Sequence, residues 1–332
     1  MQMQQPKPNR KSGSLIPALL SILITVGFAV GILWNAQTVV DWWRLRGYTP
    51  DARVVTLANV TTMSDTGRHL FYVNHPQILS GNAFSSHCSI GAEKTVILGC
   101  YESGDNGIYL YDVTDQRLQG VIETTAAHEM LHAAYNRLSP SEKNRIDALL
   151  NNFYTNGLKD ERVKQTIEAY QQSEPSELPN EMHSIFATEV AVLPPELETY
   201  YKQYFSSRGA IVAMAERYQA EFTSRRDKTV AYDTQLADLK KTIDTNQTKA
   251  SSDRRKLESV SSQLQSLRRN GDDAAYNQLV GSYNSSVNAY NTLLGTIRSQ
   301  IDRYNLIVGQ RNAVALEERD LAKSLSGDAS TQ

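Results

Sequence analysis

Residues 128–132 read HEMLH, with two histidines four positions apart and a glutamate directly after the first. On a helix, side chains four positions apart project from the same face, one turn above each other, so His128 and His132 could bind one zinc ion together. Glu129 would lie beside this pair, where a carboxylate can take a proton from a water molecule that the metal activates. The neighbouring positions carry no charge, which suits a helix packed into a core. The spacing therefore predicts a catalytic metal site on a buried helix.

A catalytic zinc site needs a third protein ligand and an open position for water. The predicted helix at 180–190, which lies between prolines, offers Glu181, His183 and Glu189. Glu181 opens this helix, and Glu189 lies two turns further along as the alternative third ligand. His183 follows His132 by 51 positions (183 − 132), which does not match the spacing HExxHxxGxxH of sites with three histidines. The spacing alone leaves the choice between the two glutamates open.

The two motifs, HExxH at 128–132 and NExxS at 180–184, resemble those of zincin metallopeptidases of the gluzincin, or thermolysin-like, type. The resemblance implies a zinc-dependent peptidase that acts on a peptide or protein substrate. It implies three zinc ligands, which are His128, His132 and Glu181. It also implies two catalytic side chains: Glu129 would be the general base, and His183 would donate a hydrogen bond to the tetrahedral intermediate.

One position departs from the gluzincin pattern. Those peptidases carry an acid four positions after the third ligand, where this chain has Ile185. Such an acid orients a zinc-binding histidine through a hydrogen bond, so another residue must take over that task here. Ser184 and Glu189 are the candidates.

Short elements must position these residues. Four apolar, β-branched or aromatic runs bounded by Gly, Asn, Asp or Ser predict strands of one small sheet. They are 52–57, 69–73, 94–101 and 107–113. Between the two motifs, 141–153 and 160–172 have the pattern of helices with charged outer faces, and we expect them to form a wall over the site.

The beginning of the chain predicts a membrane anchor. Residues 15–34 carry no charge, and a helix of that length crosses a bilayer. The preceding tail, 1–14, contains basic residues and no acid, which predicts a cytoplasmic N-terminus and an extracytoplasmic bulk. We expect a single-pass anchor at 15–39, with Trp42 and Trp43 at the far interface. A cleaved signal peptide is the rival interpretation.

Cys88 and Cys100 are the only cysteines of the chain. In an oxidising compartment such a pair persists as a disulfide that closes a short loop. The alternatives are two buried thiols, or a metal site at His87 and Cys88, for which no partner stands at ligand spacing.

The last third of the chain, 209–325, predicts an antiparallel coiled-coil hairpin. Apolar residues recur at 3-4 spacing from Thr229 to Leu267 and from Tyr276 to Val308, separated by turn residues at 268–273. Such a hairpin could be a spacer, a self-association surface or an arm that binds a protein partner. We expect a disordered tail at 326–332.

The 332 residues contain 34 Lys+Arg and 36 Asp+Glu, a net charge of −2, and so lack the positive field typical of nucleic-acid binding. We expect an α+β fold, with a short β-sheet and metal-binding helices in a small zincin-like domain at 48–208. The expected function is a membrane-anchored, extracytoplasmic zinc metallopeptidase. The alternative is a cell-surface coiled-coil scaffold or tether whose zinc domain is inactive or structural.

Overall fold

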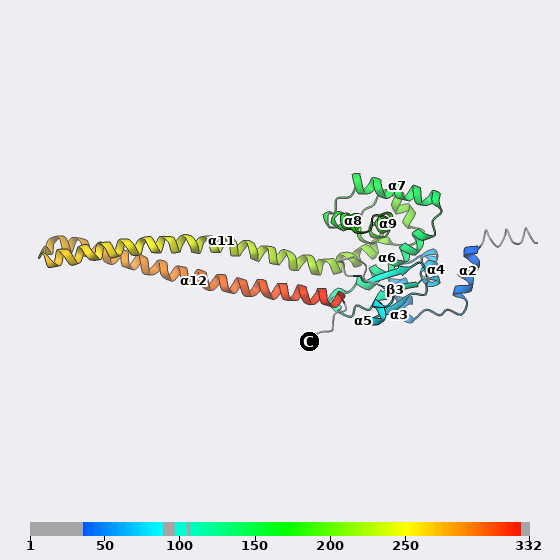
Figure 1. Cartoon of the computed structure of the whole chain (residues 1–332), viewed down its shortest axis with the longest axis horizontal. Coiled ribbons are helices and arrows are strands. Elements are labelled where there is room, and N and C mark those ends of the chain that lie inside the picture. Colours follow the sequence, from blue (N-terminus) through cyan, green and yellow to red (C-terminus); the bar gives the residue numbers. More distant parts are fainter. Residues whose placement is uncertain (1–35, 89–96, 105–106, 327–332) are drawn as a thin grey trace, which may run out of the picture.

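The computed structural model of the chain describes residues 36–88, 97–104 and 107–326, and most of them are helical (Figure 1). A helical domain with one small sheet is followed by a long two-helix hairpin that extends away from it. The elements are α2 (Ala36–Leu45), α3 (Ala52–Val60), α4 (Asp65–Val73), β1 (Gln77–Leu79), α5 (Gly81–Ser85), β2 (Gly99–Glu102), β3 (Gly107–Tyr111), the 3-10 helix η1 (Gln116–Leu118), α6 (Val121–Asn136), α7 (Pro140–Asn156), α8 (Glu161–Ser173), α9 (Leu178–Glu189), α10 (Pro195–Tyr201), α11 (Arg208–Arg269) and α12 (Asp273–Ser326).

The prediction of an α+β fold is wrong, because two of the four expected strands are helices. The segments at 52–57 and 69–73 lie in α3 and α4. Polar side chains cap both helix starts: Asp51 accepts a hydrogen bond from the amide of Arg53, and Ser64 accepts one from the amide of Gly67. These caps outweigh the strand preference of the β-branched residues that follow them. The fold is therefore mainly helical, and the expected helices at 141–153 and 160–172 are confirmed as parts of α7 and α8.

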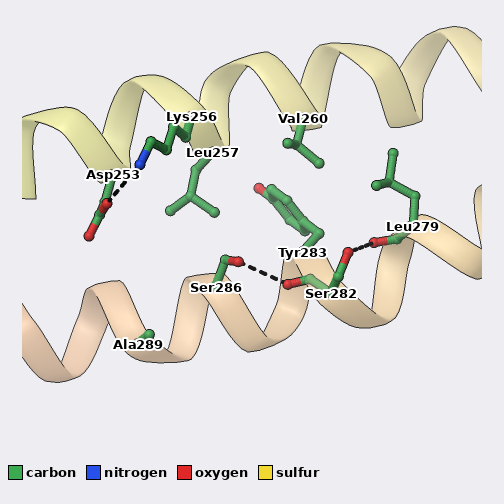
Figure 2. A pocket seen from close by; sticks show the side chains of 9 residues that line it. All are labelled: Asp253, Lys256, Leu257, Val260, Leu279, Ser282, Tyr283, Ser286 and Ala289. Carbon is green, nitrogen blue, oxygen red and sulfur yellow. Dashed lines mark hydrogen bonds and ion pairs between the residues drawn. The ribbon is translucent and has the colours of Figure 1, made fainter.

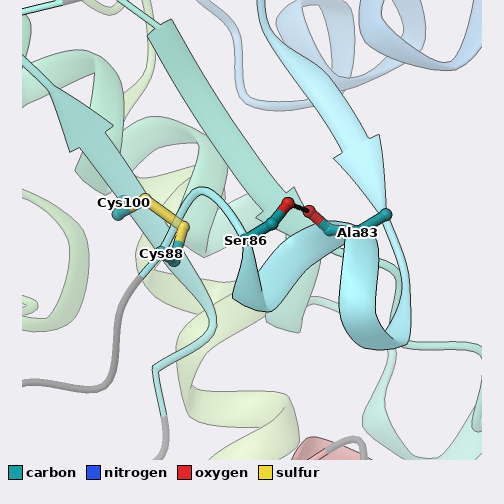
Figure 3. Close-up of a disulfide and its surroundings, with 4 residues drawn as sticks. All are labelled: Ala83, Ser86, Cys88 and Cys100. Carbon is teal, nitrogen blue, oxygen red and sulfur yellow. Dashed lines mark hydrogen bonds between the residues drawn. A yellow bond between two sulfur atoms is a disulfide. The ribbon is translucent and has the colours of Figure 1, made fainter.

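The sheet within the described residues has three short strands in the order β1-β3-β2. The central strand β3 pairs parallel with β1 and antiparallel with β2, so β2 forms one edge. A disulfide between Cys88 and Cys100 joins the segment after α5 to β2 (Figure 3), which confirms the predicted pair. The alternatives of two free thiols and of a metal site at His87 and Cys88 are therefore wrong.

Helix α6 is the centre of the domain. It packs against α9 on one side, against α3, α4 and the strands β2 and β3 on another, and against the beginning of α11. Its side chains at 126, 127, 130 and 131 have no exposed surface, as the uncharged neighbours of the histidines predict. The helix that carries HExxH is thus held from several directions, which fixes the direction of its histidines.

The predicted membrane span lies at 15–39, of which only 36–39 belong to the described residues, and these begin the short helix α2. Within the described part of the chain, no helix is long and apolar enough to cross a bilayer. Asp41 of α2 is buried, and it forms an ion pair with Arg137 at 2.7 Å and one with His69 at 2.9 Å. We therefore withdraw the prediction of a single-pass membrane protein with a cytoplasmic N-terminus and an extracytoplasmic bulk.

The hairpin of α11 and α12 is present as predicted, and the seam of α11 from Thr229 to Leu267 faces the partner helix. In α12 the predicted seam is wrong at Ile301, which is 37% exposed, whereas Tyr304 and Val308 are half-buried as predicted. The seam instead passes through Gln300, whose side chain accepts a hydrogen bond from Asn246 at 3.0 Å. This polar pair fixes the register of the two arms.

Nearer the tip, the two arms leave a cavity of about 280 Å³ between them. Figure 2 shows Tyr283 of α12 lying between the helices, opposite Val260 of α11. The space remains because small side chains such as Ser282 and Ser286 stand on the α12 side.

Both arms of the hairpin contact the start of α6. Leu321 of α12 has no exposed surface and lies in one cluster with Leu118 and Val121. On the α11 side, Gly120 lies so close to Met214 that a Cβ atom at Gly120 would be 2.5 Å from the carbonyl oxygen of Met214. Gly120 also has a φ of 102°, a conformation that glycine adopts readily. The hairpin is therefore anchored on the helix that carries the histidines.

Candidate metal centre

His128 and His132 of α6 and Glu181 of α9 converge on one point. The Nε2 atom of His128 lies 3.5 Å from Oε2 of Glu181, and Nε2 of His132 lies 3.5 Å from Oε1 of the same carboxylate. One ligand atom from each residue lies within 4.8 Å of the other two. The two imidazole rings are 4.7 Å apart and nearly perpendicular, with an interplanar angle of 79°. This group could hold a metal ion.

The surroundings of Glu181 fit a metal ligand. Its Oε2 atom is buried and has no hydrogen-bond partner, a costly state that a bound cation would relieve. Burial acts to raise the pKa of Glu181, but His132, His128 and a hydrogen bond from Tyr170 together lower the pKa below its ordinary value. The carboxylate is therefore ionised, as coordination requires.

A hydrogen bond orients His132. Its Nδ1 atom lies 3.0 Å from the side-chain oxygen of Asn180 and 3.4 Å from the hydroxyl of Ser184. Because the Asn180 oxygen can only accept, Nδ1 carries the proton, and the lone pair of Nε2 is left for a metal. Ser184 thus contacts the histidine as expected. Asn180 was missed as a supporting residue, although it directly precedes Glu181 in the NExxS motif.

Glu129 lies on the buried side of α6 and is 6% exposed. Burial raises the pKa of Glu129 to about 7, and the charge of Glu181 acts in the same direction. His132 and a hydrogen bond from the main-chain amide of Tyr101 act to lower the pKa. A carboxyl group in this state can accept or donate a proton near neutral pH.

Tyr170 of α8 is a second residue that sequence reasoning missed. It donates a hydrogen bond to the carboxylate of Glu181. The helical pattern of 160–172 predicted a wall over the site, but nothing in the spacing indicated which side chain reaches the metal centre. The direction of Tyr170 depends on how α8 packs on α9, and this packing cannot be read from the sequence.

His183 lies away from the converging side chains. It has no exposed surface, its Nε2 atom lies 3.0 Å from the hydroxyl of Tyr200, and the rings of Tyr135, Tyr201 and Tyr204 surround it. Burial lowers the pKa of His183 to about 3, so the ring is neutral. Its contacts are those of a core residue, and they give the expected hydrogen bond to a reaction intermediate no support.

Glu189, the alternative third ligand, is engaged elsewhere. Its carboxylate forms an ion pair with Arg162 at 2.7 Å and accepts a hydrogen bond from Gln219 at 2.9 Å. These contacts join α9 to α8 and α11. The structure therefore brings Glu181, and not Glu189, to the two histidines.

The likeness to gluzincins consequently rests on two short motifs whose residues meet in space. Their side chains come from α6 and α9, which pack against each other in the core of the domain. No protein-family model matches the chain, and comparisons with curated proteins and with solved structures find no match either.

Proposed function

We propose that this protein is a zinc-dependent metallopeptidase of the gluzincin type, which hydrolyses peptide bonds in a peptide or protein substrate. The proposal rests on one observation, the convergence of His128, His132 and Glu181 directly beside Glu129. Two histidines and one glutamate are the ligand set of catalytic zinc sites that keep a fourth position for water.

Zinc is favoured over other metals by the residue that accompanies the ligands. Two histidines and one carboxylate also bind iron(II) in oxygenases, so the ligand set alone does not select the metal. Glu129 lies one position from His128 and is ready to exchange a proton, which serves hydrolysis. Metal analysis of the purified protein distinguishes the two ions.

In this mechanism His128, His132 and Glu181 hold the ion, and Asn180 keeps the His132 ring in the binding orientation. Zinc, when bound, supplies a Lewis acid that activates water and polarises the substrate carbonyl. Glu129 accepts the proton of the attacking water at its carboxylate and passes it to the nitrogen of the leaving amine. The burial of Glu129 keeps bulk water from competing for this proton.

Glu129→Gln in the full chain tests the proposal. We expect the variant to bind one zinc ion per chain, as the unchanged protein does, since residue 129 is not a ligand. Cleavage of casein or of a quenched peptide library should fall by at least about 100-fold, because the proton acceptor is lost. In the unchanged protein a chelator should abolish cleavage and added zinc should restore it. Full activity in Glu129→Gln would refute the mechanism.

A second candidate function is favoured by the size of the hairpin. α11 and α12 have 62 and 54 residues, together 116 of 332. In this alternative the hairpin is the working part, as a scaffold that binds a protein partner, and the metal domain is structural. Partner binding that survives replacement of both His128 and His132, in a protein without peptidase activity, would favour it.

A further inference from the structure

The main chain of the edge strand β2 lies so close to Glu129 at Gly99 that there is no room for a side chain. A Cβ atom at Gly99 would lie 2.9 Å from Cγ and 3.0 Å from Oε1 of Glu129, and 2.5 Å from Cγ2 of Thr125. Side chains essentially never pack at such distances, so any residue other than glycine would displace α6 side chains or the strand. Gly99 is thus required by Glu129 and not by a turn, since its backbone conformation is ordinary.

The pairing of β2 shows where its free backbone groups point. Cys100 pairs with Tyr109 of β3, and the amide of Tyr111 donates to the carbonyl of Leu98 at 2.8 Å. In an antiparallel pair every second residue exchanges hydrogen bonds with the neighbouring strand. Residues 98, 100 and 102 of this segment therefore form the hydrogen bonds to β3. The backbone groups of Gly99 and Tyr101 therefore point to the open edge, while the residues on either side hold β2 to β3.

A disulfide holds Cys100, the residue between Gly99 and Tyr101. Cys100 is bonded to Cys88 (Figure 3). Cys88 is 2% exposed and packs with Phe84 and Tyr109. β2 has only four residues, and β3 is its one hydrogen-bonded neighbour in the described sheet. So short an edge strand slips or frays easily unless something else fixes it. The disulfide supplies that fixation one residue from the contact of Gly99 with Glu129.

From this arrangement we infer that Gly99 and the Cys88–Cys100 disulfide are positioning residues for Glu129. Together they hold β2 against the side chain of Glu129, and this close contact with Gly99 sets the direction in which Glu129 faces the two histidines. The consequence for catalysis rests on the proposed peptidase function. The placement of Glu129 itself does not, and it can be measured without any substrate.

The first test adds a single methyl group. Gly99→Ala should keep the disulfide and one zinc ion per chain, because neither Cys88–Cys100 nor the three ligands change. Its kcat for a quenched peptide should fall by about 100-fold while KM changes little, since a misplacement of about 1 Å has such an effect. Gly104→Ala is the matched control, because a Cβ atom there meets nothing within 4 Å. This control should behave like the unchanged protein.

The second test removes the disulfide and reads the strand directly. In the metal-free full chain, Cys88→Ala/Cys100→Ala should raise the amide exchange rate of Glu102, which pairs with Gly107 of β3, by about tenfold or more, because the strand then opens locally. Amide exchange in α7 should stay unchanged.

The outcomes separate this inference from the proposed function. If Glu129→Gln remains active, the peptidase mechanism fails, and the amide exchange rate of Glu102 still decides whether the disulfide holds β2 in place beside Glu129. If Glu129→Gln is inactive but Gly99→Ala keeps the kcat of the unchanged protein, the inference is overturned. Unfolding of Gly99→Ala, seen as loss of the circular dichroism of helices, would also overturn it, because the clash would then not be local. If the double cysteine variant does not fold, Gly99→Ala decides alone.

Discussion

At the scale of single residues, the two glutamates of α9 differ in the cations that they face. Glu189 contacts Arg162, whose guanidinium is always charged, so its own charge is compensated within the protein. Glu181 faces two imidazoles that are neutral when they bind a metal, and its Oε2 atom has no hydrogen-bond partner. A buried carboxylate without a permanent counter-charge gains most from a divalent cation. The metal should therefore depend on Glu181 and not on Glu189.

Glu181→Gln and Glu189→Gln form a matched pair that tests this. We expect Glu181→Gln to weaken zinc binding by more than the ~10- to 100-fold that loss of an outer partner costs, because a ligand itself is removed. Glu189→Gln should bind zinc almost as the unchanged protein does. Competition with a chromophoric chelator measures both affinities. An equal loss in the two variants would show that the assignment of the third ligand is wrong.

At the scale of elements, one arginine joins the end of α9 to the start of α11. The guanidinium of Arg208, 6% exposed, donates to the carbonyls of Ala187 and Ala191 at 3.2 and 3.0 Å and forms an ion pair with Glu198. The last carbonyls of a helix have no partner within it, so Arg208 satisfies groups that would otherwise be buried and unbonded. The helix that carries Glu181 is thus terminated by the first residue of the hairpin.

Arg208→Ala should therefore lower the free energy of unfolding by about 1–3 kcal/mol, the range found when a buried acceptor loses its donor. Arg226→Ala is the control, since that side chain is 67% exposed and the change should stay within ~0.5 kcal/mol. Urea denaturation followed by circular dichroism gives both values. A loss below about 1 kcal/mol in Arg208→Ala would mean that water replaces the guanidinium at the end of α9.

Asp41 connects α2 to α4 and α6, and its contribution depends on pH. Burial acts to raise the pKa of Asp41, but hydrogen bonds from Arg137 and His69 and the charge of Arg137 lower the pKa below its ordinary value of 3.8. A group whose pKa is lowered by folding stabilises the native state above its unfolded pKa, and this stabilisation is lost as the pH falls through the folded pKa. Asp41→Asn should thus be clearly less stable than the unchanged protein at pH 6.

The difference in melting temperature between Asp41→Asn and the unchanged protein should shrink as the pH falls below about 4, because the aspartate then takes up its proton in both states. Thermal unfolding of the metal-free proteins between pH 6 and pH 3 measures it. A difference that is independent of pH would show that packing, and not the charge of Asp41, holds α2.

The elements also show which parts of the fold a sequence can predict. HExxH and the α11 seam follow regular spacings on one helix, and such patterns survive in the structure. The strands expected at 52–57 and 69–73 failed because local caps decide between helix and strand when β-branched residues occur at helical spacing. In α12 the spacing favours Ile301 over Gln300 as the seam residue, and only the hydrogen bond of Gln300 with Asn246 shows which of the two faces α11.

The residues of the candidate metal site also fall into two groups, those that the sequence can predict and those that it cannot. His128 and His132 could be placed together from their spacing, and Glu181 from its motif. Asn180 and Tyr170 could not be assigned, because their contacts depend on how α8 and α9 pack on α6. The contact of β2 with Glu129 was out of reach for the same reason. Residues on one helix can be related by counting, whereas residues on different elements need the packing angle between them.

At the scale of the whole molecule, the C-terminal end of α12 returns to the helical domain that contains α6. Leu321 has no exposed surface and packs with Leu118 and Val121 at the start of α6, and Ser324 donates a hydrogen bond to Asp115 at 3.2 Å. The two arms are thus anchored on either side of the same helix start. The hairpin and the metal domain should therefore unfold together.

Leu321→Ala should destabilise the protein by about 2–5 kcal/mol, the range for a buried leucine truncated to alanine. Leu316→Ala lies on the same helix but is 51% exposed, and it should change stability by less than about 0.5 kcal/mol. Both values come from urea denaturation with a single fluorescence transition. Two separate transitions in the unchanged protein would contradict the joint unfolding of hairpin and domain.

Both arms of the hairpin are anchored at the start of α6, so a small rotation at this base moves the distant tip by a large distance. α11 has 62 residues and spans about 93 Å at 1.5 Å per residue, so a rotation of about 5° at its base would move the tip by about 8 Å. A pair of spectroscopic probes, one at residue 270 and one on the outer face of α7, would convert a rearrangement of a fraction of an ångström between Gly120 and Met214 into a change that distance measurements resolve readily. The geometry of this molecule thus converts small movements at the start of α6 into large displacements of the hairpin tip.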